Sequence, residues 1–127
     1  MDIEQLLQWQ AGGQEVGAHT QDHVNLLNIN EITAWKQIAK SKTTLQTLLC
    51  KSVNHFCYPF GKFDERHSTM AKQAQYETAT TTVRGRVTKA TNLLTLPRVP
   101  VLRSTWLPVF WLKIATAYED NKLKVEA

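Results

Sequence analysis

The sequence predicts an α/β fold with parallel strands joined by crossover helices, because segments of strand and helix character alternate along it. Its 127 residues, 43% of them hydrophobic and 20% charged, are enough to bury one ordinary core. No internal repeat, linker or low-complexity tract divides the chain. We therefore expect a single domain over residues 1–127.

The first half of the chain predicts a helix, a strand and a second helix. Apolar side chains at helical spacing run from Ile3 to about Gln10 and stop at the glycine pair 12–13, which suits a helix end. Residues 14–18 are typical of a strand that leads into His19, and a polar loop covers 20–30. Asn30 is a good N-cap for a long helix that ends near residue 50.

The second half continues the alternation. A strand over 53–58 is followed by Pro59, and Asp64 can cap a helix that extends to about residue 75. The Thr-rich segment 76–83 and the segment 94–101 both favour strands. Ser104 is the expected cap of a last helix that reaches Tyr118, and residues 119–127 are expected to form a frayed tail.

Composition excludes several classes of protein. Fifteen Lys and Arg against eleven Asp and Glu give a net charge of +4, without the dense basic blocks of nucleic-acid-binding tails. Two cysteines, Cys50 and Cys57, make no disulfide scaffold and are expected to be buried thiols. The acidic start and the absence of a long apolar run predict no signal peptide and no membrane anchor.

His19 and His23 form the strongest chemical signal in the chain. Two imidazoles four residues apart, just after a strand end, can direct ring nitrogens at one divalent ion such as zinc. Histidine pairs at this spacing are also common on surfaces without a metal. The segment 58–61 follows the end of the next strand, and adjacent parallel strand ends face one pocket.

Four stretches in order extend this signal. They are Gly12-Gly-Gln-Glu-Val-Gly-Ala-His-Thr-Gln-Asp-His-Val-Asn-Leu, Phe56-Cys-Tyr-Pro-Phe-Gly, Tyr76-Glu-Thr-Ala-Thr-Thr-Thr and Leu96-Pro-Arg-Val. Together they resemble the polysaccharide deacetylase family, which has the NodB-homology fold, over roughly residues 3 to 101. The resemblance implies an incomplete (β/α) barrel and a hydrolase that removes acetyl groups from a polysaccharide or amino sugar.

The resemblance also implies roles for particular residues. His19 and His23 match the family's metal-binding histidines, and the expected cofactor is a divalent metal, with zinc the first candidate. Phe60 matches the position whose backbone N–H helps to hold the oxyanion, and the neighbouring Tyr58 and Pro59 match the wall of the substrate groove. Arg98 matches a residue of the late strand motif and is expected to be an active-site or groove cation.

The chain departs from the family pattern at its start. Family members carry a Thr-Phe-Asp-Asp-Gly segment that supplies the general base and a third metal ligand, and nothing before Gly12 resembles it. The chain therefore looks like the carboxyl-terminal part of a deacetylase, with a weakly held metal and no identifiable base. Asp22 and Asp64 are the first candidates for a replacement carboxylate. We expect a missing amino-terminal segment or a homo-oligomer to cover the open sheet edge.

Several alternatives stay open. The chain is either a metal-dependent deacetylase or an inactive carbohydrate-binding or structural remnant of that fold. A basic anion-binding module is a third class, which salt-sensitive binding to DNA would favour, although nucleic acid is not an expected partner. His55 is expected on the polar face of its strand, and His67 is expected to be exposed on its helix. The four tryptophans, at helical spacing with Leu and Ile, are expected to be core anchors rather than sugar-stacking platforms. The family is often exported, and the sequence leaves localisation open.

Overall fold

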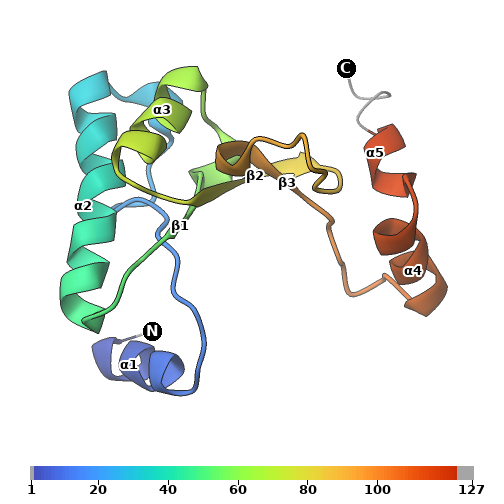
Figure 1. Cartoon of the computed structure of the whole chain (residues 1–127), viewed down its shortest axis with the longest axis horizontal. Helices are drawn as coiled ribbons and strands as arrows, with labels where there is room; N and C mark the ends of the chain where they lie inside the picture. The colour runs from blue at the N-terminus through green and yellow to red at the C-terminus, as the bar shows by residue number, and fades with distance from the viewer. Residues whose placement is uncertain (1, 123–127) are drawn as a thin grey trace.

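The computed structural model describes residues 2–122, which form a small parallel sheet with helices at its side and beyond its end (Figure 1). The α-helices are α1 (Ile3–Ala11), α2 (Glu31–Leu49), α3 (Glu65–Gln73), α4 (Leu107–Ala115) and α5 (Tyr118–Lys122). The strands are β1 (His55–Cys57), β2 (Thr78–Arg84) and β3 (Leu96–Arg98), and short 3₁₀ turns are η1 (Leu26–Asn28), η2 (Pro59–Gly61) and η3 (Leu93–Thr95). Among the described residues, no helix has the length and apolar character needed to span a bilayer.

The sheet is parallel, in the order β1-β2-β3, and confirms the predicted fold class. His55 pairs with Thr78 at the start of the β1–β2 ladder. The strand expected over 14–18 is reduced to one parallel bridge between Ala18 and Phe56. Ala18 N–H donates to His55 O at 2.8 Å, and Ala18 O accepts from Cys57 N–H at 2.9 Å. Strand β1 has three residues, so it is too short to pair with the residues that precede Ala18.

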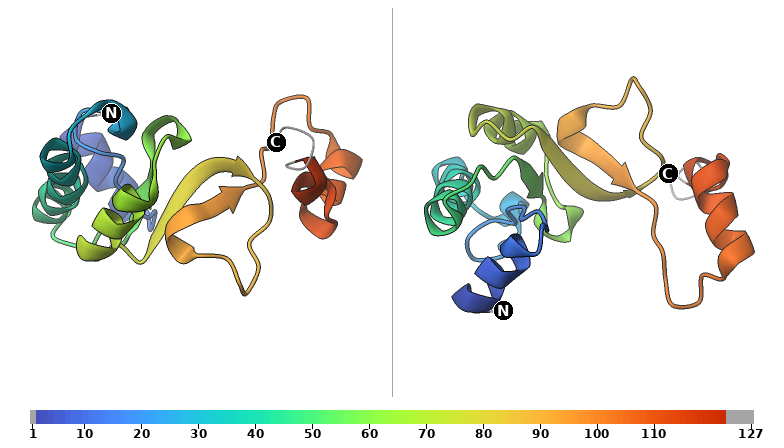
Figure 2. Two further views of the ribbon diagram at one scale, coloured as in Figure 1. Left: turned by 90° about the horizontal axis from the view of Figure 1, so that it is seen from above. Right: turned by 60° about the horizontal axis from the view of Figure 1, so that its bottom comes forward.

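The hydrophobic core lies between the sheet and helices α2 and α3, which lie together on one side of it (Figure 2). Asn30 and Asp64 cap these helices as the sequence predicts, each accepting backbone N–H groups of the first turn. Aromatic rings join the layers, since Phe56 lies 5.2 Å from Tyr58 and 5.1 Å from Tyr76 between ring centroids. This core fixes β1, and therefore everything that follows its carboxyl end.

The last helices differ from the prediction. Trp106, not Ser104, is the N-cap of α4, with Pro108 in its first turn. The helix stops at Thr116, whose extended backbone breaks the pattern that points to Tyr118. Residues 119–122, expected to be part of a frayed tail, instead belong to α5, and the fully buried Glu119 anchors this helix through an ion pair with Lys113 at 2.7 Å. Residues 123–127 lie outside the described part of the chain.

Burial also corrects three expectations. All four tryptophans are exposed rather than core anchors, to 49%, 38%, 67% and 65% for Trp9, Trp35, Trp106 and Trp111. Cys50 is exposed. His67 is buried, because its side chain accepts from the Asp64 backbone N–H at 3.1 Å and closes the capping box of α3.

Candidate functional site

His19 and His23 lie together just beyond the carboxyl end of the Ala18 bridge and β1. Their ring centroids are 4.8 Å apart, with the ring planes tilted by 57°. His19 is half-buried and His23 is exposed, so the pair meets solvent on its outer side. The structure therefore brings together the two imidazoles that the sequence singles out.

A backbone carbonyl orients the first histidine. His19 Nδ1 lies 2.7 Å from the carbonyl oxygen of Cys57, which can only accept a hydrogen bond. Nδ1 therefore carries a proton, and in the neutral imidazole the lone pair is on Nε2. This is the tautomer that a metal-binding imidazole needs, with a carbonyl as its second hydrogen-bond partner.

Gln37, on α2, fixes the loop that carries both histidines. Its buried side-chain oxygen accepts from the backbone N–H groups of Gln21 and Asp22, both at 3.0 Å. Its amide nitrogen donates to the Asp22 carboxylate at 2.6 Å. Sequence reasoning missed Gln37. The available signal was its position next to Ile38, which the helical pattern places on the buried side of the predicted helix.

The backbone around the histidines is strained. Thr20, His23 and Phe60 all adopt left-handed conformations, with φ values of 62°, 52° and 59°. Outside glycine such conformations cost about 1–3 kcal/mol each and concentrate at functional sites. Phe60 also contacts His23 edge-on, with ring centroids 4.7 Å apart, so the turn after β1 borders the histidine pair.

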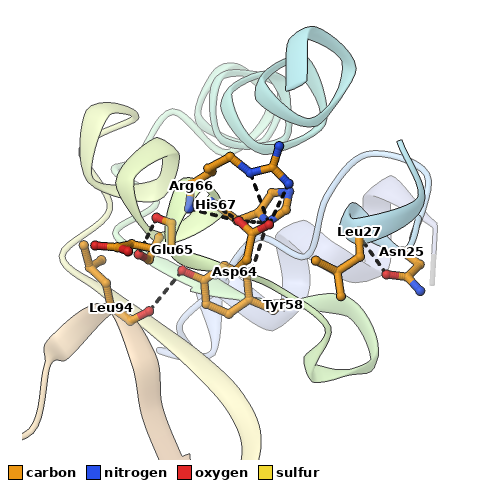
Figure 3. Close-up of polar contacts among 9 residues, drawn as sticks. Asn25, Leu27, Tyr58, Asp64, Glu65, Arg66, His67 and Leu94 are labelled. Carbon is orange, nitrogen blue, oxygen red and sulfur yellow. Dashed lines mark hydrogen bonds and ion pairs between the residues drawn. The ribbon is translucent and has the colours of Figure 1, made fainter. Parts of the chain in front are cut away.

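Tyr58 and Pro59, expected in the groove wall, are instead fully buried. The Tyr58 ring stacks on Phe63 at 4.3 Å, and its hydroxyl donates to the carbonyl oxygen of Leu94 at 3.0 Å (Figure 3). Burial raises the pKa of this hydroxyl, so the group stays protonated as a donor. Tyr58 and Pro59 therefore anchor the turn in the protein interior. Phe60, which is 57% exposed, is the residue of this motif that borders the open surface.

Arg98 crosses the sheet from β3. Its Nη2 atom lies 2.7 Å from Cys57 Sγ and donates to Thr80 Oγ1 at 3.0 Å. These partners belong to β1 and β2, so the exposed guanidinium lies on the sheet face beside the strand whose carbonyl orients His19. The role of Arg98 as a groove cation stays a prediction.

Both candidate carboxylates are engaged elsewhere. Asp22 is bound to Gln37, and Asp64 caps α3 and pairs with Arg66 at 2.7 Å (Figure 3). The hydrogen bond from Arg66 lowers the pKa of Asp64, and the backbone N–H of His67 and the charge of Arg66 lower it further. Within residues 2–122, no third Asp, Glu, His or Cys joins the histidine pair.

The pair fits a divalent cation in the nature of its donors and in the tautomer of His19, but it supplies two protein ligands. A catalytic zinc site normally has three protein ligands and one open position. The expected third ligand and base have no counterpart among the described residues. Among the described residues, the histidine pair therefore offers two of the three protein ligands that such a site has.

Comparison with known proteins identifies the architecture. The family model described as "Polysaccharide deacetylase" matches residues 3–79, which is most of the chain and includes both histidines and the Phe60 turn. The chain belongs to the polysaccharide deacetylase family. No curated protein matches this deacetylase-family chain.

Solved structures agree with this assignment. A Streptococcus pyogenes deacetylase in complex with acetate is 21% identical at a TM-score of 0.85, covering 90% of this chain and 50% of that protein. A Bacillus cereus polysaccharide deacetylase is 28% identical at 0.81, covering 90% and 36%. A CE4-family pseudoenzyme, solved as a mutant with restored activity, is 23% identical at 0.59, covering 64% and 30%. The deacetylase-family chain thus spans half or less of each of these proteins.

Proposed function

We propose that this chain carries the metal-binding half of a deacetylase site that removes acetyl groups from a polysaccharide or amino sugar. The observation that carries the proposal is the contact between His19 and His23, with the tautomer of His19 set by the Cys57 carbonyl. A divalent cation, zinc first, would supply polarisation of the acyl oxygen and a more acidic bound water.

Each residue of the site has a distinct task in this proposal. His19 and His23 hold the cation through ring nitrogens, and Gln37 keeps their loop against α2. The backbone N–H of Phe60 is the candidate donor to the oxyanion of the tetrahedral intermediate. Arg98, anchored on Thr80, is the candidate groove cation that contacts the sugar chain.

A second candidate function is an inactive carbohydrate-binding or structural remnant of the same fold. The engagement of Asp22 and Asp64 favours it, because neither carboxylate is left to activate water. One of the similar solved structures is a CE4-family pseudoenzyme, so an inactive protein with this fold supports the second candidate. The two functions share the polysaccharide partner and differ in the chemistry.

Metal binding tests the first part of the proposal. Zinc titration by calorimetry is expected to give one site on the full chain, and His19→Ala or His23→Ala should each weaken it at least about 10-fold. His55→Ala is the matched control, since His55 lies in β1 with its ring on Thr78 and Glu15. Equal zinc affinity in all four proteins would show that the pair is not the metal site.

Acetate release separates the two functions. The zinc-loaded chain is incubated with acetylated chitin-type oligomers or acetylated xylan, and free acetate is measured. Zinc-dependent release that is lost in His19→Ala but kept in His55→Ala supports the deacetylase. Binding of the oligomers without release, unchanged by zinc, supports the remnant.

A further inference from the structure

Two arginines end neighbouring strands of the sheet. Arg84 is the last residue of β2 and Arg98 the last residue of β3, and the two are partners across the parallel ladder (Figure 2). Neighbouring strands lie about 4.8 Å apart, so the two side chains leave the sheet close together. Open parallel sheets bind ligands beyond the carboxyl ends of their strands, and both arginines lie at that edge.

No acidic side chain among residues 2–122 neutralises this arginine pair. Arg86, two residues after Arg84, donates to the Asp120 carboxylate at 2.8 and 3.0 Å, whereas neither Arg84 nor Arg98 has an ion pair in the described part of the chain. Arg98 uses Nη2 alone, and its Nε and Nη1 donate to no described residue. Like charges on directly paired residues repel each other, and an anion bound between them removes that cost.

The arginine pair adjoins the candidate metal site through Cys57. Arg98 Nη2 lies 2.7 Å from Cys57 Sγ, and the carbonyl oxygen of the same residue lies 2.7 Å from His19 Nδ1. The turn η2, which carries Phe60, contacts β2 as well. The histidines, the Phe60 turn and the arginine pair therefore share one edge of the sheet, where one polysaccharide can contact all three.

The chemistry of guanidinium groups selects the kind of ligand. Carboxylate and phosphate groups offer two or more charged acceptor oxygens, which match the planar array of N–H donors on arginine. A neutral sugar hydroxyl accepts hydrogen bonds but leaves the positive charges uncompensated. Two adjacent arginines without an acidic partner therefore favour an anionic ligand over a neutral one.

We infer that Arg84 and Arg98 bind an anionic substituent, a carboxylate or a phosphate group, on the polysaccharide that this chain recognises. This inference rests on the proposed function and narrows its substrate to an anionic polysaccharide. It also adds Arg84 to the residues of the site. The attraction acts between exposed charges, so it weakens as the ionic strength rises.

Calorimetric titration of the full chain, with zinc removed by a chelator, tests the inference. The probes are an acetylated oligogalacturonate, which carries carboxylates, and its methyl ester, which is the same sugar without the charge. We expect the charged oligomer to bind at least about 10-fold more tightly at low salt, and this preference to shrink in about 0.5 M NaCl. A phosphorylated xylo-oligosaccharide, compared with its unmodified form, tests phosphate as the substituent in the same way.

Variants at the strand ends assign the preference to the two arginines. Arg84→Gln and Arg98→Gln should each weaken binding of the charged oligomer at least about 10-fold and leave binding of the methyl ester unchanged. Arg103→Gln is the matched control, because Arg103 is also exposed and without a described ion pair but lies in the connection before α4. Circular dichroism checks folding, and Arg84→Gln removes no side-chain hydrogen bond of the described residues.

Failure of this inference differs from failure of the proposed function. With zinc removed, His19→Ala should keep the preference for the charged oligomer. Equal affinities for every charged probe and its neutral form would overturn the inference and leave zinc binding untouched. If the amino-terminal segment of an intact family member, added in trans, abolishes the preference, a carboxylate of that segment occupies the arginines, and this result overturns the inference as well.

Discussion

Gln37 is the residue whose removal tests the link between the core and the metal-binding loop most directly. Its side chain makes three hydrogen bonds to the loop 19–23, two to backbone N–H groups and one to the Asp22 carboxylate. Gln37→Ala deletes all three without touching a histidine. The loop then keeps the Cys57 carbonyl contact of His19 but loses its attachment to α2.

The size of the effect follows from these bonds. The two bonds from neutral N–H groups contribute about 1 kcal/mol each and the bond to the carboxylate about 2 kcal/mol, while water replaces part of each on this exposed loop. We expect Gln37→Ala to lower the free energy of unfolding by about 2 kcal/mol. Because the loop positions both imidazoles, zinc affinity should fall about 10- to 100-fold, as for other residues that orient metal ligands.

Urea unfolding and zinc calorimetry measure the two effects on the same protein. Gln46→Ala is the control, since Gln46 lies on the same helix about 13 Å further along its axis. A conservative variant, Gln37→Glu, keeps the acceptor for both N–H groups but places a second carboxylate at Asp22, and should bind zinc less well than the wild type. Unchanged zinc affinity in Gln37→Ala would refute the idea that this side chain positions the histidines.

Three further predictions concern the turn, the cap and catalysis. Gly61→Ala should cost at least about 2 kcal/mol of stability, because φ is +65° there and the new Cβ would lie 2.0 Å from Thr82 Oγ1. Gly13→Ala is the control in thermal unfolding, since Gly13 has a φ of +85° but open space around the new Cβ. The folded-state pKa of Asp64 lies below its usual value, so its charged form contributes stability above about pH 4 that is lost as the pH falls through the folded pKa. Asp64→Asn should remove this part of the acid sensitivity, which urea titrations at pH 7 and pH 3 measure. Because no third Asp, Glu, His or Cys joins the histidine pair within residues 2–122, residues 1–127 should release acetate at least about 10³-fold more slowly than an intact family member. Adding in trans the amino-terminal segment of such a member should raise the rate, and turnover equal to the intact member would contradict this.

Local chemistry accounts for the parts of the fold that the sequence predicts well. Asn30 and Asp64 cap their helices through side chains that reach the next turn, and this depends on neighbours three residues away. The glycines at 12 and 13 end α1 for a similarly local reason. Such signals need no knowledge of the rest of the chain, which is why these boundaries agree with the structure.

Elements that depend on a partner are less predictable. The strand expected over 14–18 has the right composition, but a strand exists through its neighbour, and β1 offers a partner to Ala18 alone. Ser104 is a good cap by type, yet Pro108 and the turn before it delay the start of α4 to Leu107. His67 is polar and helical, and only the capping box at Asp64 explains its burial.

The candidate site divides in the same way. The contact between His19 and His23 follows from their spacing after a strand end, so the sequence contains it. Cys57 follows His19 by 38 residues, and Gln37 follows its loop partners Gln21 and Asp22 by 16 and 15 residues. Only the folded chain brings the Cys57 carbonyl and Gln37 to the histidine loop. Tyr58 shows the reverse error, because a motif names a position but not whether its side chain faces the groove or the core.

The tryptophans show what a burial ranking measures. Large aromatic side chains are buried on average because folded chains usually supply enough surface to cover them. Here Trp35 is exposed on α2 while Gln37 and Ile38 of the same helix are buried, and Trp111 is exposed on α4 while Lys113 is buried. Hydrogen bonds hold the buried Gln37, and an ion pair holds the buried Lys113. Their exposure is therefore set by the orientation of each helix.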